Sequence, residues 1–182
     1  MWVQEKDIEL LVDYMNKNNI DNKKILCHGT RAGYEQKYFK NHVVNLEYIL
    51  GTEISETATE FEDTIQHDFH IMKDEWENYF DIIYTNSWDH SYDPNKSLDV
   101  WINCIKINGY LFIEWNKNNL KNSKSDPFSS TMKVYKEIFN KKNNIELKNI
   151  LEIDSKQSIK PFSKIKVAKD IKKYYFFLKR IS

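Results

Sequence analysis

The sequence predicts an α/β protein with a doubly wound, mostly parallel sheet of seven strands and an antiparallel C-terminal hairpin. Two observations support the parallel part. Apolar stretches of strand length alternate with helical patterns over most of the chain. The chain has only four glycines, and two of them, Gly29 and Gly33, form a tight turn between the first strand and a helix. A third observation predicts the hairpin, because no confident helix separates the last two strands.

The expected elements follow from periodicity and from capping residues. Ile8, Leu11 and Met15 share one face of the first helix. Asp93-Pro94 opens a later helix, with the aspartate as N-cap and the proline in the first turn. The predicted strands are residues 24–27, 48–54, 64–69, 80–85, 110–115, 145–153 and 171–181. The predicted helices are residues 3–18, residues 34–40, a short helix capped by Ser55, a helix from Asp93 to Asn108-Gly109, and one around Tyr135, Ile138 and Phe139.

Length and charge limit the function classes. The 182 residues predict a single domain, 1–182, and 27 basic residues balance 27 acidic ones. This neutral charge gives no pull towards nucleic acid or an anionic membrane. Without a signal peptide or long apolar span, we expect a cytoplasmic protein. Cys27 and Cys104 are expected to be buried thiols, and neither pairs with a histidine at zinc spacing, so we expect no metal.

Polar residues gather where the predicted strands end. Ligands of open α/β sheets bind beyond the carboxyl ends of the strands, at the switch point of the topology. Glu53 ends the second strand, where its carboxylate can accept both hydroxyls of a ribose. Asp68 ends the third, where it can accept from an adenine amino group while Phe69 packs on the ring. With the glycine turn, these acids fit an adenosine-containing ligand that lies across three strand ends.

Five stretches in order resemble the motifs of class I S-adenosylmethionine-dependent methyltransferases, which are Rossmann-like proteins. They are residues 25–33, 51–54, 68–70, 80–94 and 108–114, and the fourth is similar to a subgroup with an Asn-Ser-x-Asp-His sequence. The resemblance implies S-adenosylmethionine as cofactor. The binding residues that it implies are His28, Gly29, Arg31, Gly33, Glu53, Ile54, Asp68, Phe69, Asn86 and Ser87.

Two residues depart from the pattern of that family. Cys27 stands where the family usually has an acid that contacts the methionine end of the cofactor, and Arg31 stands where it usually has a glycine. Backbone carbonyls near Gly29 or Asn86 are candidates to replace the acid. The Arg31 guanidinium is suited to hold the methionine carboxylate through a charge-assisted contact.

His90 is the best candidate for a general base, because histidine is the side chain most often used for proton transfer near neutral pH and because it follows the fourth strand. Asp89 would orient it. The competing interpretation is that residues 89–91 only support the turn before the Asp93 helix.

Four other side chains have two interpretations each. His28 fits strand-end packing as well as the site, and His70 fits surface exposure better than lining the site. Trp88 and Trp115 either wall an acceptor pocket or belong to the core.

The resulting hypothesis is a methyltransferase that acts on a small-molecule acceptor. Resemblance to glycan-modifying relatives favours O-methylation of a sugar or sugar-derived hydroxyl. The first helix, residues 116–130 and residues 154–170, or a partner, would supply the acceptor pocket. Nucleic acid and membrane are not expected partners, and the sequence leaves the oligomeric state open.

Two alternatives belong to other classes. A nicotinamide-dependent oxidoreductase shares the acid after the second strand, but Gly29-x-Arg31-x-Gly33 lacks its glycine pattern. A non-catalytic binding module with a methyltransferase-like fold would explain Cys27 and Arg31.

Overall fold

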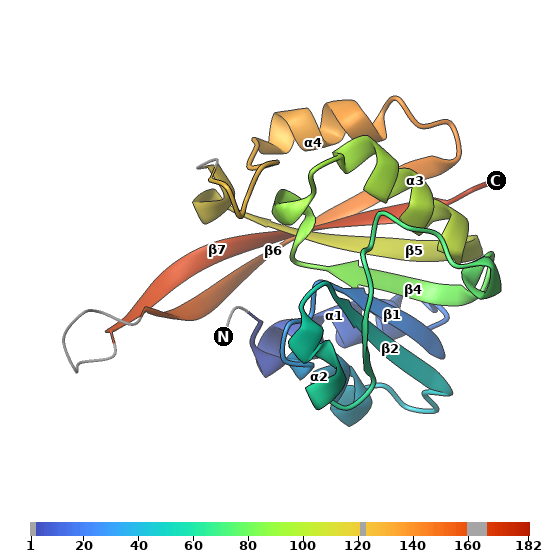
Figure 1. Ribbon diagram of the computed structural model, residues 1–182, viewed down its shortest axis with the longest axis horizontal. Helices are drawn as coiled ribbons and strands as arrows, with labels where there is room; N and C mark the ends of the chain where they lie inside the picture. Colours follow the sequence, from blue (N-terminus) through green and yellow to red (C-terminus); the bar gives the residue numbers. More distant parts are fainter. Residues whose placement is uncertain (1–2, 121–122, 160–166) are drawn as a thin grey trace.

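The computed structural model describes residues 3–120, 123–159 and 167–182, and it confirms the predicted fold class. The described residues form one seven-stranded sheet in the order β3-β2-β1-β4-β5-β7-β6 (Figure 1). The first five strands are parallel, whereas β7 runs antiparallel to β5 and β6 antiparallel to β7. The strands are β1 (Lys24–His28), β2 (Tyr48–Glu53), β3 (Thr64–Gln66), β4 (Phe80–Thr85), β5 (Ile105–Asn116), β6 (Ile145–Ile159) and β7 (Val167–Arg180).

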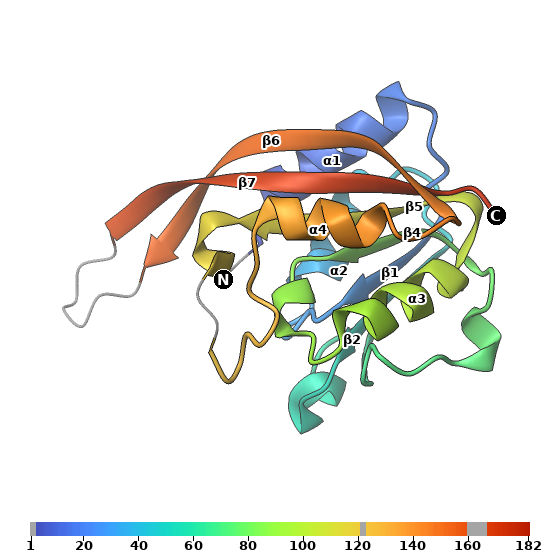
Figure 2. The same ribbon diagram turned by 90° about the horizontal axis from the view of Figure 1, so that it is seen from above.

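Helices cover both faces of this sheet (Figures 1 and 2). The helices are α1 (Glu5–Lys17), α2 (Tyr34–His42), α3 (Pro94–Cys104) and α4 (Met132–Phe139), with short 3-10 helices at η1 (Glu56–Glu60), η2 (Asp74–Trp76), η3 (Trp88–His90) and η4 (Lys117–Leu120). Among the described residues, no helix combines the length and apolar character needed to cross a bilayer.

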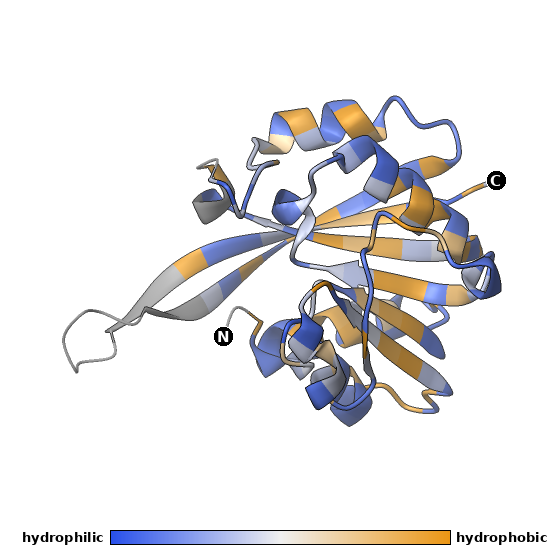
Figure 3. Ribbon diagram, viewed as in Figure 1, coloured by the Kyte–Doolittle hydropathy of each residue, from blue (hydrophilic) through white to orange (hydrophobic). Residues whose placement is uncertain are grey.

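The core consists of two layers, one on each side of the sheet. Neighbouring strand residues point to opposite faces, so Ile82 packs with α1 and α2 while Ile83 packs with α3 and α4. Every residue of β4 is buried, and apolar residues dominate the middle strands (Figure 3). The cysteines Cys27 and Cys104 are free and buried, one in each layer.

Two predicted boundaries are wrong for identifiable reasons. β3 ends at Gln66, because the Asp68 carboxylate accepts from the His70 N–H and forms a tight turn that ends the pairing. Asp68 therefore lies beyond the strand and does not end it. α3 ends at Cys104 and not at Asn108-Gly109, since the extended backbone of Ile105 begins β5 at once. The predicted caps Asp93 and Ser55 are confirmed, although the Ser55 helix is a 3-10 helix.

The C-terminal hairpin is longer than predicted. Residues 154–159 and 167–170, predicted as connection, continue β6 and β7, and residues 160–166 lie outside the described chain. The pairing of β5 with β7 ends at Asn116 opposite Lys173. Beyond that point β6 and β7 pair only with each other and project from the sheet as a two-stranded ribbon (Figure 1).

Candidate functional site

The glycine turn, residues 29–33, lies at the switch point of the sheet. β1 neighbours β2 on one side and β4 on the other, so the chain leaves the carboxyl ends of β1 and β4 in opposite directions. The turn is pressed against the end of β4: a Cβ on Gly29 would lie 2.5 Å from the Ser87 Cβ. The Ser87 hydroxyl also donates to the Gly29 carbonyl at 3.1 Å. Only glycine fits here, since its φ of 70° is also left-handed.

Glu53, at the end of β2, holds the glycine turn. Its two carboxylate oxygens accept from the backbone N–H groups of Arg31 at 2.9 Å and Ser55 at 3.1 Å. Arg31 itself has a left-handed φ of 48°, as Gly33 does at 68°. In the part of the chain that the structure describes, no ion pair or side-chain hydrogen bond engages the exposed guanidinium of Arg31. The turn therefore brings Glu53 and Arg31 together, as the sequence predicts for a ligand-binding edge.

Glu35, in the first turn of α2, is a residue that the sequence analysis missed. It is 5% exposed, and its Oε1 accepts from the Asn86 side chain at 3.1 Å. Its Oε2 has no hydrogen-bond partner among the described residues. Burial raises the pKa of Glu35 to about 7, against the lowering effect of its own backbone N–H and of Asn86. The available signal was its spacing with Tyr38 and Phe39, which puts an acid on the buried face of the helix.

Asp68 is held in place by His70 and Tyr92. Asp68 Oδ1 lies 2.7 Å from His70 Nδ1, and the Tyr92 hydroxyl donates to Oδ2 at 2.9 Å. Partial burial acts to raise the pKa of Asp68, but the hydrogen bonds from His70 and Tyr92 bring it below its usual value. His70 is 2% exposed and its Nε2 contacts the Ser91 hydroxyl at 2.7 Å, so the predicted surface exposure is wrong.

His28 lies beneath the site. Its ring stacks on Trp101 at 5.2 Å, its Nδ1 contacts the Thr52 hydroxyl at 2.8 Å, and Phe69 meets it edge-on at 6.0 Å. Burial lowers the pKa of His28 to about 3, so the imidazole is neutral. The structure confirms that His28 packs against Trp101 and Phe69, whereas its contact with a cofactor stays a prediction. Ile54, another predicted cofactor-binding residue, is exposed next to Glu53.

His90 is oriented by a residue that the sequence analysis did not select. Its Nδ1 lies 2.9 Å from Asp126 Oδ1 and 2.7 Å from the Ser125 carbonyl, while Asp89 is 4.0 Å from Nε2. Burial raises the pKa of Asp89 to about 6, opposed by the nearby His90. The three side chains hold potential metal-ligand atoms within 4.8 Å of one another, and the absence of a resident metal stays a prediction.

The two tryptophans are core residues. Trp88 is fully buried and its indole N–H donates to the Ser97 hydroxyl at 3.1 Å. Trp115 is 5% exposed and donates to the Ser130 carbonyl at 2.8 Å. The core interpretation is therefore confirmed, since both indoles belong to the apolar layer that contains α3 and α4.

A second buried polar group, the Lys173 cluster, consists of Asp7, Glu114, Ser155, Lys173 and Tyr175. The Lys173 ammonium lies 2.8 Å from Asp7 and 3.3 Å from Glu114. Ser155 donates to Asp7 at 3.1 Å and Tyr175 donates to Glu114 at 2.8 Å. The cluster ties α1 to β5, β6 and β7, and its two carboxylates share the one ammonium group.

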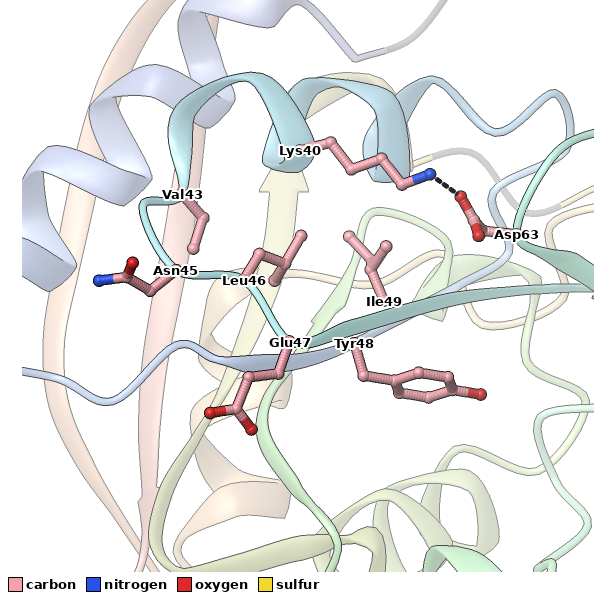
Figure 4. Close-up of a pocket in the computed structure, with 8 residues that line it drawn as sticks. All are labelled: Lys40, Val43, Asn45, Leu46, Glu47, Tyr48, Ile49 and Asp63. Carbon is pink, nitrogen blue, oxygen red and sulfur yellow. Dashed lines mark ion pairs between the residues drawn. The ribbon is translucent and has the colours of Figure 1, made fainter.

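An open groove of about 500 Å³ lies at the opposite edge of the sheet. Figure 4 shows its lining, with Lys40 and Asp63 forming an ion pair. The groove is formed by the end of α2 and the start of β2, and it includes none of the predicted site residues. The candidate site is therefore the carboxyl edge and not this groove. The lining residues are Lys40, Val43, Asn45, Leu46, Glu47, Tyr48, Ile49 and Asp63.

The sequence matches no family model and no curated protein. Solved structures are similar in fold. A methyltransferase described as putative from Bacillus halodurans is 12% identical with a TM-score of 0.67, and the match covers 94% of this chain and 99% of that one. A similarly described S-adenosylmethionine-dependent methyltransferase from Listeria monocytogenes is 10% identical with a TM-score of 0.62, covering 95% and 100%.

The plantazolicin methyltransferase BpumL, solved in complex with S-adenosylhomocysteine, is 14% identical with a TM-score of 0.64. The match covers 96% of this chain and 82% of BpumL. Together with the strand order and the antiparallel C-terminal strand, these likenesses show that this chain has the fold of class I S-adenosylmethionine-dependent methyltransferases.

Proposed function

We propose that this protein is an S-adenosylmethionine-dependent methyltransferase that acts on a small-molecule acceptor. The observation that carries the proposal is the carboxyl edge of β1, β2 and β4, where the glycine turn lies beside Glu53 and close to the Glu35 oxygen that no described residue bonds. This edge fits the cofactor because the buried Glu35 carboxylate has an oxygen with no hydrogen-bond partner among the described residues, and the Arg31 guanidinium of the glycine turn is exposed. The methyltransferase fold supports the same assignment.

The residues divide by the part of the cofactor that they would hold. Glu53 would accept the ribose hydroxyls, and Asp68 with Phe69 would bind adenine. Arg31, whose guanidinium is exposed, would pair with the methionine carboxylate. Between the adenosine and methionine ends, the cofactor would contact Gly29, Asn86 and Ser87. The neighbouring residues His28, Gly33 and Ile54 would flank these contacts.

When bound, the cofactor supplies a sulfonium methyl group that an acceptor oxygen attacks in line, with the C–S bond breaking and its electron pair remaining on sulfur. The chain aligns the two molecules and removes a proton. With Nδ1–H donated towards Asp126 and the Ser125 carbonyl, His90 would keep its Nε2 lone pair for the acceptor hydroxyl. In this proposal Asp126, rather than Asp89, has the main orienting role.

For the acceptor, we propose a sugar or sugar-derived hydroxyl. This rests on the resemblance of residues 86–90 to glycan-modifying relatives. BpumL, which is similar in fold, is named as a plantazolicin methyltransferase and not as a sugar methyltransferase. Residues 123–130 reach the site through the His90 contacts and would contribute to the acceptor pocket. A cytoplasmic location without membrane or nucleic-acid partners belongs to the same proposal.

A thermal-shift panel with S-adenosylmethionine, S-adenosylhomocysteine, NAD and NADP tests the proposal. At a hundred times its dissociation constant, a ligand stabilises the folded state by about 2.7 kcal/mol. For a chain of this length that corresponds to a shift of roughly 5–10 °C. We expect this shift with the first two ligands and none with the dinucleotides.

The alternatives give different outcomes. Stabilisation by NAD or NADP alone would favour the oxidoreductase. Binding of S-adenosylmethionine without any methyl transfer across a panel of sugar and other hydroxyl acceptors would favour the non-catalytic binding module. A lack of response to all four ligands would contradict the proposed function.

A further inference from the structure

Glu35 differs from the other buried acids among the described residues, which are Asp7, Asp81 and Glu114. Asp81 accepts from the Lys106 ammonium at 2.6 Å and from a backbone N–H at 2.9 Å. Asp7 and Glu114 belong to the Lys173 cluster and share its ammonium. Glu35 has one side-chain donor, the neutral Asn86, and its Oε2 has no hydrogen-bond partner among the described residues. A buried carboxylate of this kind is costly unless a cation completes it.

Glu35 lies close to the glycine turn, where a bound ligand could supply such a cation. Its partner Asn86 directly follows β4, and Ser87 beside it contacts Gly29 of the turn. The carboxylate is also close enough to the Cys27 thiol to raise its pKa, after the larger effect of burial. Glu35 thus lies at the switch point, next to the strand residue that stands where an acid was expected.

We propose that the Glu35 carboxylate receives the methionine ammonium group of S-adenosylmethionine, replacing from helix α2 the acid that β1 lacks at Cys27. The proposal rests on the proposed function. An ammonium group offers three donors, so it can satisfy Oε2 while the Asn86 bond to Oε1 remains. Arg31, on the other side of the turn, would bind the carboxylate of the same amino-acid group.

This assignment makes cofactor binding release a proton. With a pKa near 7 in the free protein, Glu35 is partly protonated at neutral pH, and an ammonium group would require the carboxylate form. The affinity should therefore fall as the pH drops below 7. The charged or titratable groups around it are Cys27, Tyr38, Tyr84, Glu114 and Lys173. Burial raises the pKa values of the Cys27 and Tyr84 side chains, so neither titrates in this range.

Glu35→Gln tests the proposal, because the amide keeps the shape and an acceptor for Asn86 but has no charge. Titration calorimetry with S-adenosylhomocysteine should show a loss of affinity of about tenfold to a hundredfold. The affinity for 5′-methylthioadenosine, which has no amino-acid group, should not change. From pH 8 to pH 6 the wild-type affinity for S-adenosylhomocysteine should fall about tenfold relative to 5′-methylthioadenosine. The variant should lose this pH dependence.

Glu47→Gln, an exposed acid at the opposite edge, is the matched control and should bind both ligands like the wild type. Equal losses for both ligands with a normal melting temperature, or no loss for either, would overturn the role of Glu35. A variant that melts early is replaced by Glu35→Asp, which should restore part of the selective affinity if the charge matters. Failure of the wild type to bind either ligand would instead contradict the proposed function.

Discussion

Glu35 and the two acids of the Lys173 cluster are all buried, but only the acids of the cluster are paired with a cation. In the Lys173 cluster, two carboxylates share one ammonium and accept further hydrogen bonds from Ser155 and Tyr175. Glu35 has a single side-chain donor, the neutral Asn86, and an oxygen with no partner among the described residues. The acids of the Lys173 cluster are thus paired with a cation inside the fold, whereas Glu35 lacks a cation at the edge where α/β sheets bind ligands.

This difference indicates different roles for buried acids of the same chemical type. The Lys173 cluster, whose carboxylates have a cation, should contribute to folding and have little effect on ligand binding. The Glu35 carboxylate should lower the stability of the free protein when it is charged and increase the affinity for a ligand that carries a cation. The His90 ring resembles Glu35, because Asp126 holds one nitrogen and the other faces Asp89 only at 4.0 Å.

Lys173→Met should give the largest loss of stability. It would leave Asp7 and Glu114 buried without their shared cation, so the free energy of unfolding should fall by about 3–5 kcal/mol in chemical denaturation. Lys172→Met, one residue away and exposed, is the control and should change little. Similar losses in the two variants would mean that the cluster is not the structural element described here.

His90→Ala should slow methyl transfer to a hydroxyl acceptor by roughly a hundred- to ten-thousand-fold, the usual contribution of a general base. Its affinity for S-adenosylmethionine should barely change, since the ring would face the acceptor. Asp126→Asn should slow transfer more than Asp89→Asn. Near-normal turnover of His90→Ala would contradict the role of His90 as a base. The rate would then depend only on how the protein aligns the acceptor with the methyl group.

The charge on Glu35 should make the free protein less stable as the pH rises. Its pKa is raised from 4.5 to about 7 in the folded state, so the folded chain binds the proton more tightly than the unfolded chain. The stabilisation is full below pH 4.5 and is lost as the pH rises through 7. Relative to Glu35→Gln, the wild-type free energy of unfolding should fall by about 2.5 kcal/mol from pH 5 to pH 8. Parallel stability curves would show that Glu35 is not buried and unpaired.

Glu53→Ala should weaken S-adenosylmethionine binding by roughly tenfold to a hundredfold in calorimetry, as expected for charge-assisted hydrogen bonds. The fold should remain, because the carboxylate bonds only two exposed backbone N–H groups, those of Arg31 and Ser55. Glu60→Ala, an exposed acid nearby, serves as the control. An unchanged affinity would remove Glu53 from the site.

Arg31→Ala should have the smallest effect, since its guanidinium is exposed to solvent. We expect a loss of about tenfold in affinity for S-adenosylhomocysteine and no loss for 5′-methylthioadenosine, which has no carboxylate. The backbone strain at Arg31 is the same with alanine. Equal losses for both ligands would assign Arg31 a structural role.

Local patterns were sufficient to predict most of the fold. The Asp93-Pro94 start of α3, the apolar stretch of β4 and the glycine turn all depend on residues close in sequence. The errors occur where side chains compete with the backbone pattern. The Asp68 turn shortens β3, and the extended backbone at Ile105 ends α3 early.

The site was harder to predict, because its contacts join distant parts of the chain. Glu53 and Arg31 were found through their positions at a strand end and a turn. The pairing of His90 with Asp126 spans 36 residues and depends on how residues 123–130 fold back. Glu35 was visible only as an acid on the apolar face of α2, a pattern that alone does not distinguish a buried carboxylate from an exposed one.

A crystal structure of the protein with S-adenosylhomocysteine bound would test the Glu35 assignment most directly. We expect the methionine ammonium at hydrogen-bond distance from Glu35 Oε2, the ribose hydroxyls on Glu53 and the adenine beside Asp68 and Phe69. A ligand bound in the groove that Lys40 and Asp63 line, or one at the carboxyl edge with its ammonium turned away from Glu35, would contradict this assignment.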